Sequence, residues 1–462
     1  MTLEITNPAK PATVVATYAT IGVGEIDEII EKATAAQATW KDIPQPERGR
    51  LLRRYLDALS ANADRISQSI TAEMGKIRAE SEGEVAKSIA EGHAAVDRAS
   101  APIGEVFPSQ FSGVMAYTMR RPRGVVLGIT PWNFPFGTPV RKSIPAMLYG
   151  NSIILKPATI APGAVAMMVE IAKGILPDNL IQAAIGSGTV GQAMCEHEGI
   201  DAVTFTGSVK VGKIVAAAAS SHLAEVNLEL GGKNPVVFND ASNLDEALGQ
   251  VFKAAFAIGG QRCTAISRVL VNEAIEKDVV AGLAKLAAAV TPSDGSKAGA
   301  TFGPLSSKQQ LDEVVGFVER AQAEGASIAA GGMAMPNEEG GYYYLPTILS
   351  GVSSDMEVAQ EEVFGPVLAV IPYSDIDKAL EIANSTAYGL TCSLYSEQAP
   401  IIDTFLQHID SGMLHVNSGT FPENHLPFVG AKDSALGVGG SNGPSVMQFY
   451  TSEHTVYRKG QA

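Results

Sequence analysis

The sequence has few cysteines and no recognisable pattern of metal ligands. Its 462 residues contain three cysteines, Cys195, Cys263 and Cys392, which are odd in number and far apart. This usage argues against a disulfide framework and is typical of a reducing compartment. Of the seven histidines, only His197 lies within two positions of a cysteine, and no paired ligand spacing follows it. We therefore expect no metal site.

The sequence also lacks long basic and long apolar stretches. The net charge is −15 (34 − 49) and no long basic block appears, which argues against binding to nucleic acid or to an anionic membrane surface. No segment offers the roughly 18 apolar residues that a membrane span needs, and residues 1–8 show neither a cationic start nor an apolar core. We expect a soluble, cytoplasmic protein of two or three domains.

What the sequence does contain is a repeated alternation of strand and helix patterns. Residues 25–42 and 47–74 have the apolar spacing of amphipathic helices. From residue 151 to 206 strands and helices alternate, which predicts a doubly wound parallel sheet with its ligand at the carboxyl ends of the strands. After Asn234 the alternation begins again, with expected strands at 235–238 and 268–271 and expected helices at 244–257 and 275–290. Two α/β domains are therefore predicted.

Cys263 is a candidate nucleophile. Gly259 and Gly260 free the backbone just ahead of the thiol, and Arg262 places a positive charge beside it. A nearby cation and backbone N–H groups would favour the thiolate over the thiol, whose ordinary pKa is about 8.5. The alternative from this segment alone is a buried cysteine that fills space in a core.

Two further segments favour the nucleophile. Glu229 ends an apolar run that breaks on paired glycines, where burial would raise its pKa towards the working range of a general base. Asn133 follows the apolar run 124–130 and lies within the stiff turn Pro131-Trp132-Asn133-Phe134-Pro135. Its amide could stabilise an oxyanion.

At these segments the chain resembles the aldehyde dehydrogenase superfamily, and the resemblance extends over nearly the whole length. Glu229 lies 34 positions before Cys263 (263 − 229), and the other matching segments follow in the order of the family. They are residues 73–76, 131–135, 150–151, 156–157, 205–208, 229–234, 261–263, 361–367 and 388–390.

The resemblance implies an α/β fold with two doubly wound parallel-sheet domains and a small β segment for oligomerisation. Residues 1–112 and 124–230 would form the dinucleotide-binding domain, and residues 231–430 the catalytic domain that carries the thiol. Residues 113–123 and 451–462 would form strands that pair subunits in a homodimer or homotetramer. The alternative for these strands is a pair of ordinary sheet edges.

The resemblance also implies a nicotinamide cofactor. Residues 186–191 fit G-x-G-x-x-G, yet in this family the pyrophosphate lies nearer the segment that matches Gly207 and Ser208, so we interpret 186–191 as a structural turn. The further expected cofactor contacts are Trp132, Lys156, Thr159, Leu230, Glu362 and Phe364.

Thr159 bears on the choice of cofactor. Many members carry Glu at this position, where it binds the ribose hydroxyls and repels a 2′-phosphate. Thr159 removes that repulsion and Lys156 supplies a cation, so we expect NADP, or use of both cofactors, ahead of strict use of NAD.

In the implied mechanism Cys263 attacks an aldehyde, Asn133 and the Cys263 N–H hold the oxyanion, hydride passes to the nicotinamide, and Glu229 activates water to hydrolyse the thioester. Arg141 matches a residue that binds the substrate carboxylate in succinic semialdehyde dehydrogenases. The resemblance therefore implies a semialdehyde such as succinate semialdehyde as the substrate, with an aromatic aldehyde as the alternative, because aromatic aldehyde dehydrogenases also carry this Arg. A coenzyme-A-acylating enzyme or a non-catalytic member is less favoured, since Glu229, Cys263 and Asn133 are all present.

Two positions depart from the family pattern. Ala265 replaces the second cysteine that succinic semialdehyde dehydrogenases often have, so no redox switch of that kind is expected. Val438 replaces a frequent Arg, which puts the mouth of the substrate funnel in doubt.

Overall fold

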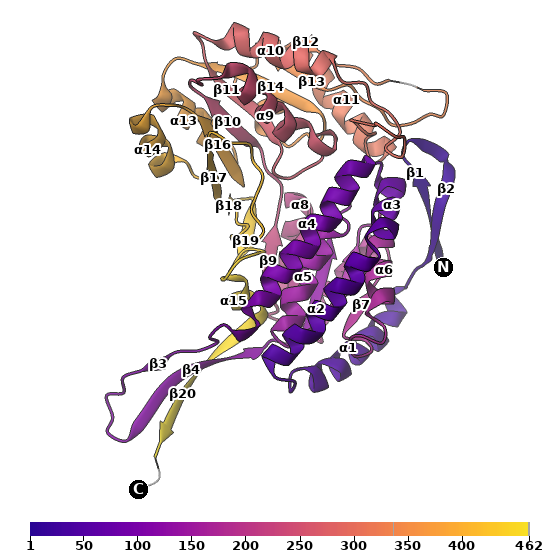
Figure 1. The fold of residues 1–462 in the computed structure, drawn as a ribbon, viewed down its shortest axis with the longest axis vertical. Helices are drawn as coiled ribbons and strands as arrows, with labels where there is room; N and C mark the ends of the chain where they lie inside the picture. Colours follow the sequence, from indigo (N-terminus) through magenta and orange to yellow (C-terminus); the bar gives the residue numbers. More distant parts are fainter. Residues whose placement is uncertain (336, 461–462) are drawn as a thin grey trace.

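The computed structural model describes residues 1–335 and 337–460; Pro336 and the last two residues of the predicted tail strand, Gln461 and Ala462, lie outside the described residues. The chain forms two bodies, each built on a sheet, and an arm that projects from one of them (Figure 1). Among the described residues, no helix has the length and apolar character needed to cross a bilayer.

The first body begins with elements that only partly follow the expectation. A hairpin of β1 (Thr2–Asn7) and β2 (Lys10–Ala19) precedes helix α1 (Ile26–Trp40), and this hairpin was not predicted. The single helix expected over 47–74 is wrong, because the structure has α2 (Gln45–Ala61) and α3 (Ala63–Met74) there. Asn62 separates them: its Nδ2 donates to the Ala58 carbonyl at 2.9 Å and so caps the end of α2. Helix α4 (Arg78–Val96) follows.

The sheet of this body has the strand order β19-β9-β8-β5-β6-β7. The strands are β19 (Ala435–Gly437), β9 (Glu225–Glu229), β8 (Ala202–Thr206), β5 (Val125–Thr130), β6 (Ser152–Pro157) and β7 (Ile181–Ala183). All neighbours are parallel except β19, which returns from the far end of the sequence to pair antiparallel with β9. The connecting helices are α5 (Gly137–Leu148), α6 (Gly163–Ala172), α7 (Gly188–Cys195) and α8 (Val209–Ser220).

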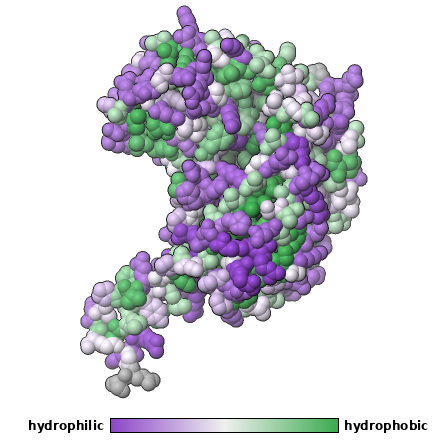
Figure 2. Space-filling view, viewed as in Figure 1, coloured by the Kyte–Doolittle hydropathy of each residue, from purple (hydrophilic) through white to green (hydrophobic). Residues whose placement is uncertain are grey.

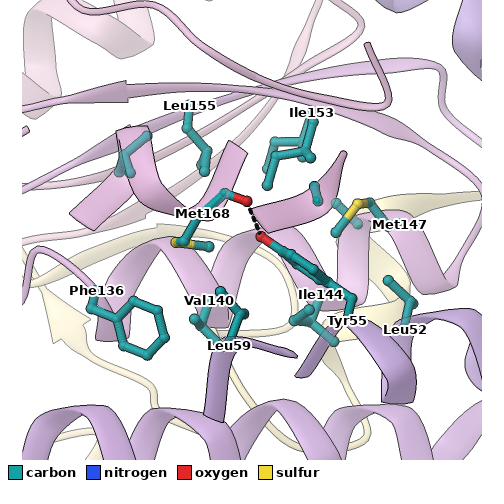
Figure 3. Close-up of a cluster of buried hydrophobic side chains, with 14 of the residues drawn as sticks. Leu52, Tyr55, Leu59, Phe136, Val140, Ile144, Met147, Ile153, Leu155 and Met168 are labelled. Carbon is teal, nitrogen blue, oxygen red and sulfur yellow. Dashed lines mark hydrogen bonds between the residues drawn. The ribbon is translucent and has the colours of Figure 1, made fainter. Parts of the chain in front are cut away.

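Apolar side chains fill the space between these helices and the sheet. Figure 3 shows Leu52 and Tyr55 of α2 packed with Ile144 of α5 and Ile153 of β6. Polar groups within this cluster find backbone partners: the Tyr55 hydroxyl donates to the Met168 carbonyl at 2.8 Å, and Trp40 Nε1 donates to the Met147 carbonyl at 2.7 Å. A parallel strand buried on both faces reads as a continuous apolar run, which is why the alternation could be recognised from the sequence.

The second body contains a seven-stranded sheet with the order β12-β13-β14-β11-β10-β16-β17. Only β12 pairs antiparallel with its neighbour, and two apolar cores flank the sheet, with Val237 in one core and Val236 in the other. The fold is therefore the predicted α/β arrangement of two doubly wound parallel sheets, with an added antiparallel strand at one edge of each. The strands are β12 (Ser327–Ala330), β13 (Thr347–Ser350), β14 (Val367–Tyr373), β11 (Ile266–Asn272), β10 (Asn234–Phe238), β16 (Thr391–Tyr395) and β17 (Met413–Val416).

Helices cover both faces of this second sheet. They are α9 (Leu244–Phe256), α10 (Glu276–Ala288), α11 (Lys308–Ala323), the short α12 (Glu357–Gln360), α13 (Ile376–Asn384) and α14 (Ala399–His408). After them, β18 (Ala431–Lys432) pairs with β15 (Tyr388–Gly389), and α15 (Val446–Tyr450) leads back to the arm.

The arm is a three-stranded antiparallel sheet in which β4 (Val114–Pro122) lies between β3 (Val106–Phe107) and β20 (Thr451–Lys459). Its two long strands fall at the segments expected to be β-structure, whereas β3 was not predicted. Val106 and Tyr457 are more than two-thirds exposed, and Phe111 and Met115 also face solvent. Figure 2 shows green, hydrophobic patches on the projecting arm.

Candidate active site

Three neighbouring strands of the first sheet end beside one another. β9 ends at Glu229, β8 is followed by Gly207 and Ser208, and β5 leads through Pro131 to Asn133. Because parallel strands point their carboxyl ends to one edge of the sheet, residues distant in sequence meet there. The second body supplies Cys263 from the loop before β11.

These residues line a single cavity of about 1090 Å³. It brings together most of the residues predicted for the site: Trp132, Asn133, Arg141, Lys156, Gly207, Ser208, Glu229, Leu230, Cys263, Glu362 and Phe364. Over the described residues, Thr159 is missing from this lining, and its side chain is exposed. Residues 186–191 are likewise absent from it, and 188–191 form the first turn of helix α7.

The loop before Cys263 holds an unusual backbone conformation. Ile258, Gly259 and Gly260 have φ values of 58°, 63° and 71°, a left-handed run that costs a β-branched residue such as Ile258 conformational energy. A Cβ atom at Gly260 would lie 2.2 Å from the Gly365 carbonyl oxygen, so only glycine fits there. Beyond the run, the Asn234 amide donates to the Cys263 carbonyl at 2.7 Å and fixes the residue that carries the thiol.

The thiol itself is half-buried, and its surroundings favour the protonated form. Burial, followed by the negative charge of Glu362, raises the pKa of Cys263 to about 11. The positive charges of Arg141 and Arg262 lower this pKa, as expected for Arg262, but burial outweighs them. The Arg262 guanidinium donates to Thr264 Oγ1 at 2.9 Å and to the Thr420 carbonyl at 3.1 Å, which fixes the cation beside the thiol.

Glu229 has the environment of a general base. Its side chain is buried, and Oε2 has no hydrogen-bond partner within the described part of the chain. Burial raises the pKa of Glu229 above its usual range, while the positive charge of Lys142 opposes that rise. Lys142 is buried as well, donates to Thr204 Oγ1 at 2.7 Å, and has its own pKa lowered by burial. A carboxyl group in this state can take up and release a proton near neutral pH.

Asn133 lies within reach of the thiol loop. Its side-chain Nδ2 donates one hydrogen bond to the Gln261 backbone carbonyl at 2.9 Å, and the backbone carbonyl of Asn133 accepts from Lys76 Nζ at 2.8 Å. An amide has two N–H donors, so one remains for a ligand. The side chain that can stabilise an oxyanion is thus oriented before any substrate arrives.

Glu362 and Phe364 also line the cavity. Glu362 Oε1 accepts from the Gly232 N–H at 3.1 Å, and burial raises the pKa of Glu362 to about 7. Phe364 has a φ of 53°, rare for a bulky residue, and its ring meets Trp132 edge to face with centroids 5.4 Å apart. Strain kept at such a position is typical of a functional site.

The same cavity has features that suit a dinucleotide. Ser208 lines the cavity and caps helix α8 by accepting from the Val211 N–H, and a helix N-terminus favours a bound anion such as a pyrophosphate. A Cβ atom at Gly191 would lie 3.0 Å from the Lys156 side chain, so the glycine leaves room for that cation at the cavity wall. Among the described residues, no cluster of three or more His, Cys, Asp or Glu side chains could hold a metal ion.

Arg141 is held by an acid that the sequence did not single out. Its Nε and Nη2 donate to both oxygens of Glu91 on α4, at 3.2, 2.9 and 3.1 Å, and its guanidinium lies 5.0 Å from the centre of the Phe428 ring. No described residue accepts from Nη1. Glu91 lies fifty positions away, so only the fold could reveal the pairing.

Comparison with known proteins gives a consistent result. The sequence model described as the aldehyde dehydrogenase family matches residues 1–456. An α-ketoglutarate semialdehyde dehydrogenase of Haloferax volcanii is 38% identical, covering 99% of this chain and 95% of the relative. An α-ketoglutaric semialdehyde dehydrogenase of Bacillus subtilis is 36% identical, covering 99% and 94%.

Solved structures agree. Lactaldehyde dehydrogenase from Escherichia coli has a TM-score of 0.96 at 31% identity, covering 100% of this chain and 96% of that chain. A betaine aldehyde dehydrogenase from Staphylococcus aureus, determined with NAD+, has a TM-score of 0.96 at 26% identity, covering 99% and 93%.

Proposed function

The chain belongs to the aldehyde dehydrogenase family, and we propose that it oxidises a semialdehyde with a remote carboxylate, of the α-ketoglutarate semialdehyde class, to the dicarboxylic acid. The observation that carries the proposal is the meeting of Cys263, Glu229 and Asn133 in one cavity that Arg141 also lines. Two relatives that match nearly the whole chain act on α-ketoglutarate semialdehyde by name, which favours this substrate over the succinate semialdehyde expected from the sequence.

The first chemical step belongs to Cys263. Its thiol loses a proton to a neighbouring carboxylate or to water, and the sulfur adds to the aldehyde carbon. The carbonyl oxygen gains the negative charge, and the free N–H of Asn133 and the backbone N–H of Cys263 hold it. Because the hydrogen bond from Asn133 to Gln261 is already in place, little reorganisation is needed.

The nicotinamide cofactor, when bound, accepts a hydride from the former aldehyde carbon. Ser208 and its helix N-terminus would hold the pyrophosphate, Leu230 would pack beside it, and Glu362 and Phe364 would orient the nicotinamide end against Trp132. Glu229 then takes a proton from water, the oxygen attacks the thioester carbon, and the carbon–sulfur bond breaks to release the acid. Glu229 favours water as the acyl acceptor over the thiol of coenzyme A.

Arg141 is proposed to bind the remote carboxylate. Its contact with Glu91 fixes the guanidinium fork in advance, so less side-chain entropy is lost when a carboxylate binds to the remaining donors. The same contact also neutralises part of its charge. An uncharged aromatic aldehyde is the alternative substrate, favoured by Phe421 and Phe428 in the cavity lining.

We propose NADP, or both cofactors, for this enzyme, since Thr159 offers no carboxylate to repel a 2′-phosphate and Lys156 offers a cation. The exposed apolar residues of the arm support subunit pairing in a homodimer or homotetramer, because an isolated two- or three-stranded sheet gains little stability without a partner surface.

The direct experiment is the absorbance of reduced cofactor formed from a panel of aldehydes. α-Ketoglutarate semialdehyde, succinate semialdehyde and benzaldehyde are each offered with NAD+ and with NADP+, in the presence and absence of coenzyme A. We expect the highest kcat/KM for α-ketoglutarate semialdehyde and no dependence on coenzyme A. A preference for benzaldehyde, or a requirement for coenzyme A, would overturn the proposal.

A further inference from the structure

Three charged side chains at the start of helix α4 lie outside the reaction as proposed, yet they contact both loops of the site. Lys76 lies two residues before α4, and Glu80 and Glu84 lie in its first two turns. The spacing of four residues puts Glu80 and Glu84 on one face of the helix.

Lys76 and Glu84 form a buried ion pair against the turn that carries Asn133. Lys76 Nζ lies 2.5 Å from Glu84 Oε2, and the two side chains are 0% and 2% exposed. The same ammonium group donates to the backbone carbonyl of Asn133 at 2.8 Å. Glu84 Oε1 accepts from the backbone N–H groups of Phe136 and Gly137, at 3.0 and 2.9 Å. The ion pair is thus hydrogen-bonded to both ends of the segment 133–137.

Glu80 contacts the other loop. Its Oε1 accepts from the Ile258 N–H at 2.7 Å, and Ile258 begins the left-handed run that leads to Cys263. Burial raises the pKa of Glu80, and the contact with Ile258 opposes that rise. An ionised or neutral carboxyl group can accept this bond through the same oxygen, so the contact does not depend on charge alone.

The start of α4 therefore lies between the two bodies. Arg78 N–H donates to the Gly295 carbonyl at 3.0 Å, and a Cβ atom at Gly303 would lie 2.3 Å from the Gly75 carbonyl oxygen, so backbone packs on backbone here. Asn133 comes from the first body and Cys263 from the second. A rigid element that contacts both loops can set their mutual distance.

We propose that Lys76, Glu80 and Glu84 are positioning residues that align the Asn133 amide with the Cys263 thiol. They act through these two residues and need no contact with substrate or cofactor. The inference rests on the proposed oxyanion role of Asn133, and it adds a specific cause for the alignment of two loops that approach from different bodies.

A second glutamate of the same kind provides a matched control. Glu73 is also buried, and its Oε2 accepts from the N–H of Gly163, the first residue of α6, at 3.0 Å. Glu84 does the same for Gly137, the first residue of α5. Glu73 contacts neither Asn133 nor the loop before Cys263 among the described residues. Glu73→Gln therefore replaces a buried carboxyl group at a helix start without touching the proposed alignment.

The experiment measures the rate of the first turnover, as reduced cofactor formed in a stopped-flow instrument, together with the melting temperature. Glu84→Gln places an amide N–H₂ opposite the Lys76 ammonium, two donors face to face, and should displace Lys76 from Asn133. We expect acylation to slow by about tenfold to a hundredfold, the range for a misplaced catalytic group. Glu73→Gln should lower the melting temperature to a similar degree and leave the first turnover unchanged.

A double-mutant cycle with Asn133→Ala shows whether Glu84 acts through Asn133. In the Asn133→Ala background, Glu84→Gln should change acylation by no more than about twofold, because the group it positions is gone. Equal losses in both backgrounds would overturn the inference, as would undiminished acylation in Glu84→Gln. Lys76→Met offers the same test should Glu84→Gln fail to fold.

The role of Glu80 is tested by comparing two substitutions at that position. Glu80→Gln keeps an oxygen acceptor for the Ile258 N–H and should retain first-turnover activity, whereas Glu80→Leu should lose it at unchanged cofactor affinity. Equal activity of the two variants would contradict the assignment of Glu80. If Asn133→Ala alone leaves acylation undiminished, the oxyanion role in the proposed function fails, and that result is distinct from an additive cycle.

Discussion

Replacement of Glu229 by glutamine separates the two halves of the reaction. The residue ends strand β9, is buried, and has its pKa raised by burial. Glutamine matches its shape but cannot take a proton from water. A positioned general base contributes about 10²–10⁴-fold, or about 2.7–5.5 kcal/mol, to the step that it serves. We expect deacylation to slow by that factor while acylation continues.

The fold should tolerate Glu229→Gln. The new amide has a buried N–H₂ to satisfy, which costs about 1–3 kcal/mol, but a buried carboxyl group whose ionisation is costly disappears at the same time. Lys142 keeps its bond to Thr204. The net change in the free energy of unfolding should therefore be small beside the loss in deacylation.

The assay is a pre-steady-state record of reduced cofactor. The variant should give a burst of about one equivalent per active site followed by slow turnover. Steady-state kcat of the wild type should fall on the acid side as Glu229 is protonated, at a pH above the ordinary glutamate pKa of about 4.3, and this limb should vanish in the variant. Glu225 is half-buried at the start of the same strand and pairs with Arg123 at 2.8 Å, away from the cavity lining, so Glu225→Gln is the control and should keep both the burst and the turnover of the wild type. Loss of the burst together with turnover would refute the assignment and make Glu229 the base for the thiol.

Two further changes test the binding of substrate and cofactor. Arg141→Met should raise KM for a semialdehyde by about tenfold to over a hundredfold, equivalent to 1.5–3 kcal/mol for a lost charge-assisted contact, and leave an uncharged aldehyde of similar length almost unaffected. The double variant Arg141→Met, Glu91→Gln controls for the buried carboxylate left behind, and equal damage to both substrates with a lower melting temperature would make Arg141 a purely structural residue. Thr159→Glu should raise KM for NADP+ more than for NAD+, by about 1 kcal/mol because the exposed site is screened, whereas equal changes would place Thr159 away from the ribose.

The parts of the site that could be predicted are those written into local sequence. Cys263, Glu229 and Asn133 each follow an apolar run or paired glycines, and their order along the chain matches that of a known family. The two sheets could be predicted for the same reason, because a parallel strand buried on both faces is a continuous apolar run in the local sequence. The direction of a side chain is not local, however. Arg262 is adjacent to the thiol in sequence, but its guanidinium turns to Thr264 and Thr420.

The parts that could not be predicted depend on long-range contacts. Strand β19 pairs with β9 across some two hundred residues, and Glu91 meets Arg141 across fifty. The break between α2 and α3 at Asn62 could not be predicted because the apolar spacing of the sequence continues from one helix into the next. Lys76 lies in a matching segment, but nothing in the sequence indicates that its ammonium reaches the carbonyl of Asn133.

The measurement that tests the account most directly compares the three cysteines one at a time. Cys195 and Cys392 are fully buried in the cores, whereas Cys263 lies at the cavity. Cys263→Ala should abolish oxidation of every aldehyde while binding of NAD(P)+, followed by titration, stays close to wild type, because the thiol forms the covalent intermediate. Cys195→Ala and Cys392→Ala should keep turnover once their lower stability is allowed for. Appreciable turnover by Cys263→Ala would contradict the mechanism.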